Sequence, residues 1–403
     1  MHILLIHQAF AALNEAGGTR HYEMAEYLAG QGHQVTIIAS PVSYLSGKRR
    51  SDVRWAEKQT PQPGITIIRS YTLPVLHRNF VLRVFSFFSF MFSSFIEGIK
   101  VPKVDLVWGT SPPIFQGLTA WALARLKGVP FLFEVRDLWP AFAIAVGVLK
   151  NPLLIRLSEG LERFLYRHAD QVMVNSPGYL GYVQERGAKK VALIPNGADP
   201  AMFAVAVDSA GTLRQKYSLT GKFVVLYAGA HGLSNDLDVL LDAAVRLRSQ
   251  PHIHFLFVGD GKEKPALQQR VAAEALTNVT FMASVPKTEM AGVLAMADVC
   301  VAILKPIEMY KTTYPNKVFD YMAAGKPVLL AIDGVIREVV ESTQAGIAVP
   351  PGNPQALADG IMVLASHPDE ARAMGQAGRN AIIQSFNRAH FSQEFELLLK
   401  DLR

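Results

Sequence analysis

The segment 306–327 holds the residue types in this chain best suited to chemistry. Its second half has a helical pattern that predicts a helix starting near Pro315 and stopping at Gly325. Lys317 would then lie in the first turn, beside free backbone N–H groups and the positive end of the helix dipole, with Asp320 one turn later. A cation followed by a carboxylate at a helix start suits a nucleoside diphosphate and its ribose hydroxyls. The alternative is an ordinary strand–loop–helix unit with solvated charges.

Two glycine turns are further candidates for binding a phosphate or a sugar. The run 17–20 (Gly-Gly-Thr-Arg) follows the first expected strand, and the run 258–261 (Val-Gly-Asp-Gly) follows a strand in the second half. Glycine allows backbone N–H groups to approach a ligand closely, and Arg20 adds a positive charge. Neither run has the Gly-x-Gly-x-x-Gly spacing, and no phosphate loop with Gly-Lys-Ser/Thr occurs, so an NAD enzyme or a P-loop NTPase is not expected.

The positions of these turns follow from an alternating pattern of short apolar strands and helices. This alternation predicts an α/β fold in which a parallel sheet is wrapped by helices, and the pattern restarts after a stretch of small and polar residues at 198–220. We therefore predict two doubly wound, Rossmann-like domains. The expected strands are Ile3–Ile6, Val35–Ala39, Ile65–Arg69, Leu106–Trp108, Phe131–Val135, Gln171–Val174, Val191–Pro195, Val224–Ala228, His254–Val258, Val279–Met282, Val299–Leu304 and Val328–Ala331.

Length and composition agree with two cores. The chain has 403 residues, half of them apolar, which suits two domains of about 200 residues. Its single cysteine, Cys300, lies in an apolar run, so we expect a buried, inert thiol, no internal disulfide and a reducing cytoplasm. The first residues lack the basic lead of a signal peptide and are expected to form a strand.

The net charge of +6 is concentrated in one region. Residues 41–103 contain ten Lys or Arg against three Asp or Glu, and they enclose the uncharged, Phe-rich run 84–96. As a helix this run is about 20 Å long, too short to span a bilayer of about 30 Å. A basic, Phe-rich segment at 74–100 is typical of a peripheral anchor on an anionic membrane, and the alternative is a buried core helix. Nucleic-acid binding is not expected, since no binding motif accompanies the basic residues.

Several motifs in order along nearly the whole chain resemble glycosyltransferase family 4, the retaining nucleotide-sugar transferases of GT-B fold. The bacterial branch that builds O-antigen, capsule or exopolysaccharide, similar to the fucosamine transferases, is indicated by Phe133–Pro140 and by the Pro-x-Lys at 315–317. The other motifs that carry the resemblance are the Gly17-Gly18 turn, Ile194–Asp199, Val258–Gly261, Ala297–Val299 and Asp320–Val328.

The resemblance implies two domains that face a central cleft. Residues 1–200 would bind the acceptor and include the membrane-associating segment 74–100, residues 201–385 would bind a nucleotide-sugar, and a C-terminal helix in 386–403 would pack on the first domain. It further implies a UDP-sugar donor, with an N-acetylated amino sugar as one option, and a lipid-linked glycan acceptor. No cofactor and no divalent metal are expected. The place of action would be the inner face of the bacterial cytoplasmic membrane.

The same resemblance assigns donor-site roles. Asp320 would be the second acid of the Glu-x7-Glu motif and bind the ribose, while Lys317 would neutralise the diphosphate. Backbone at Gly17 and Gly18 would approach the diphosphate and the transferred sugar. Further backbone donors and base contacts are expected at Gly259 and from Met282 to Val285.

The chain departs from the family pattern at two places. Thr312 occupies the position of the first acid, and Glu308, four residues earlier, is a possible substitute. The usual Arg and Lys are missing from 227–235, so Lys317, Arg20 or Arg136 and helix N-termini would have to meet the diphosphate charge.

Three residues outside the motif helix complete the candidates. Arg136 and Asp137 follow a strand of the first domain, where an open α/β sheet presents its site. Asp137 would orient the acceptor hydroxyl or stabilise an oxocarbenium-like transition state; the alternative is an N-cap on a helix from Leu138. His231 is expected on the donor side as a neutral hydrogen-bonding group. A UDP-sugar 2-epimerase of the same fold and a non-enzymatic membrane-surface protein are the alternative functions.

Overall fold

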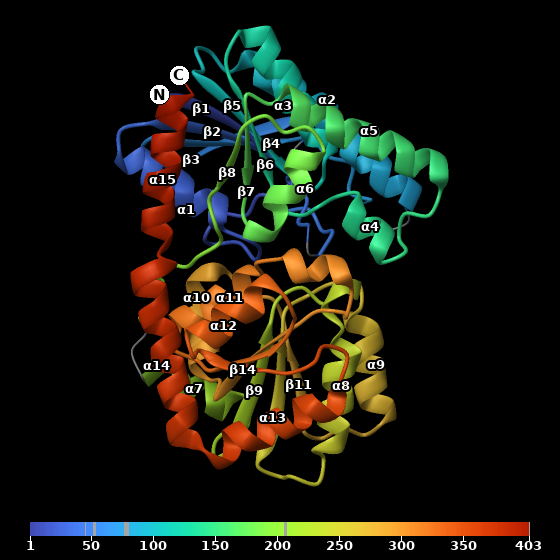
Figure 1. Cartoon of the computed structure of the whole chain (residues 1–403), viewed down its shortest axis with the longest axis vertical. Coiled ribbons are helices and arrows are strands. Elements are labelled where there is room, and N and C mark those ends of the chain that lie inside the picture. Colours follow the sequence, from blue (N-terminus) through green and yellow to red (C-terminus); the bar gives the residue numbers. More distant parts are fainter. Residues whose placement is uncertain (45, 51–53, 76–79, 205–207, 403) are drawn as a thin grey trace. The chain divides into compact units, whose positions relative to one another are not determined.

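The computed structural model of the chain describes residues 1–44, 46–50, 54–75, 80–204 and 208–402. These residues form two compact units (Figure 1). The first comprises Met1–Ala12, Gly17–Pro195 and Ala389–Arg403, and the second comprises Leu13–Ala16 and Asn196–Arg388. The predicted join at 198–220 therefore lies inside the second unit, and its residues 205–207 are outside the described residues.

The first unit is built on an eight-stranded sheet in the order β3-β4-β2-β1-β5-β6-β7-β8. All neighbouring strands are parallel except β3 and β4. The order reverses between β1 and β5, and such a switch point opens a crevice at the carboxyl ends of the strands. The strands are β1 (His2–Ile6), β2 (Gln34–Ala39), β3 (Ala56–Gln62), β4 (Ile65–Ser70), β5 (Leu106–Ser111), β6 (Phe131–Val135), β7 (Gln171–Val174) and β8 (Val191–Leu193).

Helices cover both faces of this sheet. Figure 1 shows α1 and α15 on one side of the sheet and α2, α3 and α5 on the other. The strand order runs in opposite directions from the switch point, so right-handed connections place helices on both faces. On the α15 side, Phe395 packs on Trp108 of β5 with ring centroids 4.7 Å apart. The helices are α1 (Arg20–Gly30), α2 (Phe80–Lys100), α3 (Phe115–Lys127), α4 (Ala141–Ala145), α5 (Pro152–His168), α6 (Leu180–Glu185) and α15 (Arg388–Asp401).

Helix α2 corrects the length argument made for the Phe-rich run. The helix has 21 residues, so it is about 32 Å long rather than 20 Å, and its part from Leu82 to Lys100 is long and apolar enough to cross a bilayer by length and composition alone. Its inner side nevertheless packs in the first unit: Ser86, Phe90 and Ser93 are fully buried. Residues 76–79 of the predicted membrane segment lie outside the described residues.

The second unit has a six-stranded parallel sheet in the order β11-β10-β9-β12-β13-β14. Its switch point lies between β9 and β12. The elements are β9 (Phe223–Ala228), β10 (Ile253–Val258), β11 (Val279–Met282), β12 (Val299–Ile303), β13 (Val328–Ala331) and β14 (Gly346–Ala348), with α7 (Asp208–Lys216), α8 (Leu237–Arg246), α9 (Lys264–Ala273), α10 (Lys287–Ala295), α11 (Asn316–Ala323), α12 (Val335–Ser342), α13 (Pro354–Ser366) and α14 (Pro368–Ser385).

The predicted α/β class and every predicted strand are confirmed, whereas two strands were missed. Strand β3 consists mostly of polar residues and forms the exposed antiparallel edge of its sheet, so it lacks the apolar run used to recognise strands. Strand β14 has only three half-buried residues. The expected burial of Cys300 is also confirmed, and burial raises the pKa of its thiol to about 12.

Candidate functional site

The predicted helix start at Pro315 is confirmed, and it brings Lys317 to the switch point of the second sheet. Pro315 is the N-cap of α11, and Lys317 lies in the first turn. The Lys317 ammonium donates to the hydroxyl of Tyr227 at 2.8 Å and to Oδ1 of Asn235 at 2.9 Å. It also lies 4.2 Å from the ring centroid of Tyr227. Tyr227 belongs to β9 and Asn235 to the loop after it. The ammonium of Lys317 therefore lies beside the segment 227–235, in which the sequence lacks the expected Arg and Lys.

The surroundings of Lys317 make its charge responsive to a ligand. Burial lowers the pKa of Lys317 to about 7, because its two polar partners are neutral and cannot replace the lost hydration. A bound diphosphate would supply the missing negative charge and favour the ammonium. The site can therefore accept an anion together with a proton.

Asp320 is held by a lysine that the sequence analysis did not single out. Lys287, at the start of α10, pairs with Asp320 at 2.7 Å, and both side chains are largely buried. The Lys287 ammonium also lies 4.9 Å from the ring centroid of Phe203. The pair fixes the Asp320 carboxylate on α11 next to the loop after β11, where base contacts are expected.

Three glycines after β9 and β10, namely Gly229, Gly259 and Gly261, allow two loops to pack closely. A Cβ on Gly259 would lie 1.9 Å from the carbonyl oxygen of Gly229, and a Cβ on Gly261 would lie 2.4 Å from that of His231. All three glycines have positive φ angles, which favour glycine. The backbones of the loops after β9 and β10 can therefore approach this closely only with glycine at these positions, whether or not a ligand is present.

His231 lies fully buried between aromatic rings. Tyr227, Phe257 and Phe281 have ring centroids 5.9, 6.3 and 6.0 Å from that of His231. Within the described residues neither ring nitrogen has a hydrogen-bond partner. Burial, followed by the charges of Lys264 and Lys317, lowers the pKa of His231 to about 4, so the imidazole is neutral at pH 7.

A second missed lysine, Lys264, joins the ends of two strands. Its ammonium donates to the carbonyl oxygens of Gly259 at 2.7 Å and Met282 at 2.8 Å. These bonds hold the loop after β10 against the predicted base-contacting segment, in which Met282 is buried and Val285 half-buried. Lys264 therefore supports the shape of this segment.

The position of the missing first acid lies at the end of a short 3-10 helix, Glu308–Thr312. The Thr312 hydroxyl donates to the Met309 carbonyl at 2.6 Å. Glu308, the possible substitute, pairs with Lys311 at 2.7 Å and is 82% exposed. The donor-site roles of Thr312 and Glu308 stay predictions.

In the first unit, Arg136 is fixed at the switch point between β1 and β5. Its guanidinium donates to the Thr110 hydroxyl at 2.9 Å, to the carbonyls of Ser111 and Pro112, and to Nε2 of the buried His7 at 3.1 Å. Burial, with His21 and Arg136 nearby, lowers the pKa of His7 well below its ordinary value. His7 is therefore a neutral acceptor that orients Arg136.

Asp137 is not the N-cap suggested as an alternative. Helix α4 begins at Ala141 with Pro140 as its N-cap, so no helix starts at Leu138. Burial raises the pKa of Asp137 to about 6, although the adjacent Arg136 opposes the shift. A carboxyl group with this pKa at the carboxyl end of β6 can orient an acceptor hydroxyl.

Arg20 is occupied by protein partners. It is buried and donates to Glu134 at 3.2 Å and to the carbonyls of Ile194 and Pro195 at 2.7 Å each. A contact between Arg20 and a diphosphate would have to replace some of these bonds.

The neighbouring Gly18 is exposed, and a Cβ there would meet nothing within 4 Å, so its backbone remains open to a ligand.

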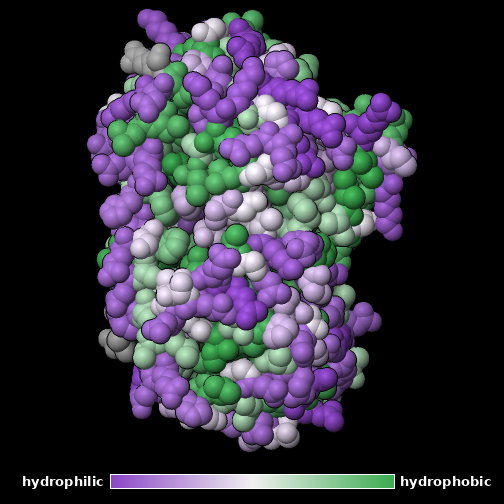
Figure 2. All heavy atoms as spheres, viewed as in Figure 1, coloured by the Kyte–Doolittle hydropathy of each residue, from purple (hydrophilic) through white to green (hydrophobic). Residues whose placement is uncertain are grey.

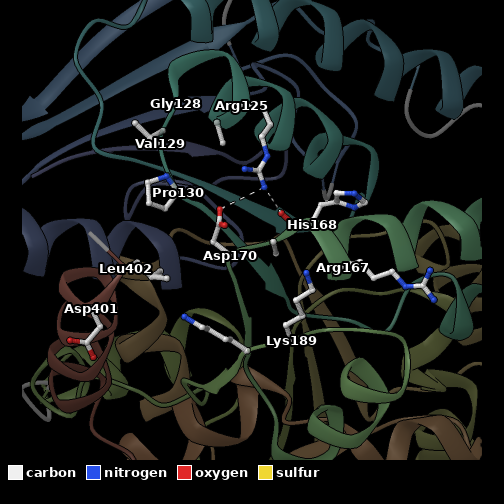
Figure 3. Close-up of a pocket in the computed structure, with 13 residues that line it drawn as sticks. Arg125, Gly128, Val129, Pro130, Arg167, His168, Asp170, Lys189, Asp401 and Leu402 are labelled. Carbon is white, nitrogen blue, oxygen red and sulfur yellow. Dashed lines mark hydrogen bonds and ion pairs between the residues drawn. The ribbon is translucent and has the colours of Figure 1, made fainter.

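A basic pocket of about 760 Å³ lies elsewhere in the first unit (Figure 3). Its lining residues Pro130, Asp170 and Lys190 immediately precede β6, β7 and β8, so it lies at the amino ends of these strands. Arg136 and Asp137 follow β6 at the opposite edge. Figure 3 shows Arg125 bridging to Asp170 and to the His168 carbonyl. The pocket is therefore separate from the candidate site.

The described residues contain no group of three or more His, Cys, Asp or Glu side chains that could hold a metal ion. The absence of a metal requirement remains a prediction.

Comparison with known proteins identifies the family. Residues 16–197 match a family model described as "Glycosyl transferase 4-like domain", and residues 222–367 match one described as "Glycosyl transferases group 1". The chain is 26% identical over 366 residues to a putative colanic acid biosynthesis glycosyl transferase, WcaI, of Escherichia coli K12, covering 87% of this chain and 89% of that protein. An O-antigen chain mannosyltransferase of Escherichia coli is 20% identical over 60% of this chain and 64% of its own length.

Solved structures support the same fold. A sucrose-phosphate synthase from Thermosynechococcus elongatus has a TM-score of 0.80 at 20% identity, covering 100% of this chain and 99% of its own. Anabaena HepE in complex with UDP and glucose has a TM-score of 0.74 at 16% identity, with both chains fully covered. The fold is that of the GT-B glycosyltransferases. The chain belongs to the glycosyltransferase family that the two matching models describe.

Proposed function

We propose that this protein transfers a sugar from a UDP-sugar, with retention of anomeric configuration, to a lipid-linked glycan in bacterial surface-polysaccharide synthesis. The observation that carries the proposal is the Lys317 ammonium held by Tyr227 and Asn235 at the switch point of the second sheet. A GT-B switch point is where a nucleotide-sugar binds, and a half-buried cation there favours a diphosphate.

Further features support the donor. Asp320, one turn after Lys317 and ion-paired with Lys287, is placed to accept from ribose hydroxyls. A solved relative of the same fold binds UDP and glucose. Relatives named for colanic acid and O-antigen synthesis point to a surface polysaccharide as the product.

The proposed reaction needs no covalent enzyme intermediate. The acceptor hydroxyl oxygen attacks the anomeric carbon while the bond from this carbon to the diphosphate oxygen breaks on the same face. The hydroxyl proton passes to the departing diphosphate, and Lys317 stabilises the negative charge that develops there. No metal is required in this scheme, because Lys317 and backbone donors provide the stabilisation.

Acceptor recognition is assigned to the first unit. Arg136 and Asp137 lie at the carboxyl ends of its strands, and the exposed Phe side chains of α2 suit peripheral contact with the inner face of the cytoplasmic membrane. A lipid-linked acceptor resides at that surface.

The test measures UDP release from a panel of UDP-sugars, with and without lipid-linked acceptors. We expect UDP release to depend on an acceptor. The new linkage should keep the anomeric configuration, axial or equatorial, that the sugar has in the donor. Formation of a 2-epimer without acceptor would favour the epimerase alternative. Release of GDP from GDP-mannose, with no UDP released from any of the UDP-sugars, would contradict the proposed donor.

A further inference from the structure

Helix α5 exposes a leucine stripe that the sequence analysis did not single out. Leu153 and Leu157 are 65% and 61% exposed, and Leu154 is also exposed. Leu153 and Leu157 share one side of the helix by their i, i+4 spacing, and Phe164, further along the same side, packs on Trp121 of α3. The opposite side carries the buried Glu162 and Tyr166, which face the first unit. Leu153 and Leu157 therefore lie outside the buried face of α5 and form, with Leu154, the leucine stripe.

A row of arginines runs beside this stripe. Arg156, Arg163 and Arg167 recur at intervals of seven and four residues and are all exposed. In helical projection they lie next to the leucine stripe, on the side away from Leu154. An exposed apolar stripe flanked by basic side chains is typical of a helix that lies in a membrane interface.

The same side of the first unit carries the exposed face of α2. Helix α3 contacts both helices: Phe115 packs on Phe88 of α2 with ring centroids 5.4 Å apart, and Trp121 packs on Phe164 of α5 at 4.8 Å. On α2 the usual pattern is inverted. Ser86 and Ser93 are buried and donate to the carbonyls of Leu73 and Tyr71, at 2.8 and 2.6 Å.

Three phenylalanines of α2 are exposed, whereas Phe90 is buried. Phe85, Phe88 and Phe92 are 57%, 48% and 64% exposed. In the space-filling view, hydrophobic and strongly hydrophilic side chains adjoin on the flank of the first unit where Figure 1 places α5 (Figure 2). Two helices on one side of the sheet thus expose large apolar side chains, one of them with an arginine row.

We propose that α5 is a second membrane-contacting helix, which inserts Leu153 and Leu157 among the acyl chains of an anionic bilayer and pairs its arginines with lipid phosphates. The proposal rests on the proposed peripheral membrane contact and extends it from α2 to α5. Charge complementarity selects this occupant: the exposed arginines, of which Arg163 also pairs with Glu159 at 3.8 Å, suit anionic headgroups, whereas a neutral apolar groove would not need them.

A single-cysteine probe tests the contact directly. Leu157→Cys is labelled with the environment-sensitive dye NBD, and the native Cys300 does not compete because it is fully buried. Vesicles of phosphatidylglycerol and phosphatidylcholine should shift NBD emission to the blue and raise its intensity severalfold, while pure phosphatidylcholine should have a much smaller effect. Leu397→Cys on α15, with a parent side chain 54% exposed, is the matched control and should not respond.

Charge and apolar contributions are then separated. Arg156→Gln with Arg163→Gln should weaken binding to anionic vesicles at least tenfold, and Arg372→Gln, at an exposed site on α14, should not change it. The proposal is overturned if the Leu157 probe stays unshifted while the protein binds vesicles through α2. A blue shift without vesicles that grows with protein concentration would also overturn it, since a second copy would then cover α5. Neither readout uses donor or acceptor, so failure here is distinct from failure of the transferase assignment.

Discussion

Donor binding should be coupled to proton uptake at Lys317. In the free protein, burial places the pKa of Lys317 at about 7, so about nine in ten molecules carry a neutral amine at pH 8. A diphosphate beside this amine restores its ordinary pKa of about 10.4, so UDP binding at pH 8 should take up about 0.9 proton. Above pH 7 the affinity should then fall about tenfold per pH unit.

Isothermal titration calorimetry with UDP in buffers of different ionisation enthalpy measures this uptake. At pH 8 the terminal phosphate of UDP is already ionised, with a pKa of about 6, so it adds little. Lys317→Arg, which stays charged at pH 8, is the control and should bind UDP without proton uptake. Tight UDP binding to the wild type with no proton uptake at pH 8 would show that the phosphate and Lys317 are not neighbours.

The other predictions concern the ribose, the membrane, the metal and the acceptor. Asp320→Asn should mainly raise the donor KM, through a loss of about 1.5–3 kcal/mol of binding free energy, since ribose hydroxyls bond equally in ground and transition states. An unchanged KM in steady-state assays would argue against ribose contact. Replacing Phe85, Phe88 and Phe92 with Ser should release the protein from anionic vesicles in sedimentation assays and leave UDP binding intact, because these side chains are exposed. EDTA should not change calorimetric UDP affinity, and a requirement for Mg²⁺ or Mn²⁺ would contradict the proposed site. The pH–rate profile for an acceptor should lose an inflection near pH 6 in Asp137→Asn, as that carboxyl has a pKa of about 6.

Local patterns were enough to locate α11. The helix start at Pro315 followed from residue spacing, because caps and apolar periodicity act within a few residues. The partners of Lys317 could not be found in this way. Tyr227 and Asn235 lie 90 and 82 residues earlier in the chain, and only the order of β9 and β12 in the sheet brings their loop to α11. The same holds for Lys287 beside Asp320.

The Phe-rich helix shows a different limit of the sequence. Its composition is apolar on nearly every side, so periodicity could not decide between a core helix and an interfacial one. The structure gives α2 both properties. Ser86 and Ser93 face inward, where carbonyls of the loop after β4 accept from them, and Phe85, Phe88 and Phe92 are left exposed. A hydrogen bond from a helix serine to a distant loop carbonyl is a tertiary feature that no local pattern reveals.

We propose Lys317 as the donor-site cation of a UDP-sugar transferase. The most direct measurement is kcat/KM for acceptor-dependent UDP release by Lys317→Ala, with folding checked by circular dichroism. Because negative charge grows on the diphosphate as the glycosidic bond breaks, kcat/KM should fall by roughly 10²- to 10³-fold, with much of the loss in kcat. Near-wild-type kinetics in a folded Lys317→Ala protein would show that the donor diphosphate does not bind at Lys317.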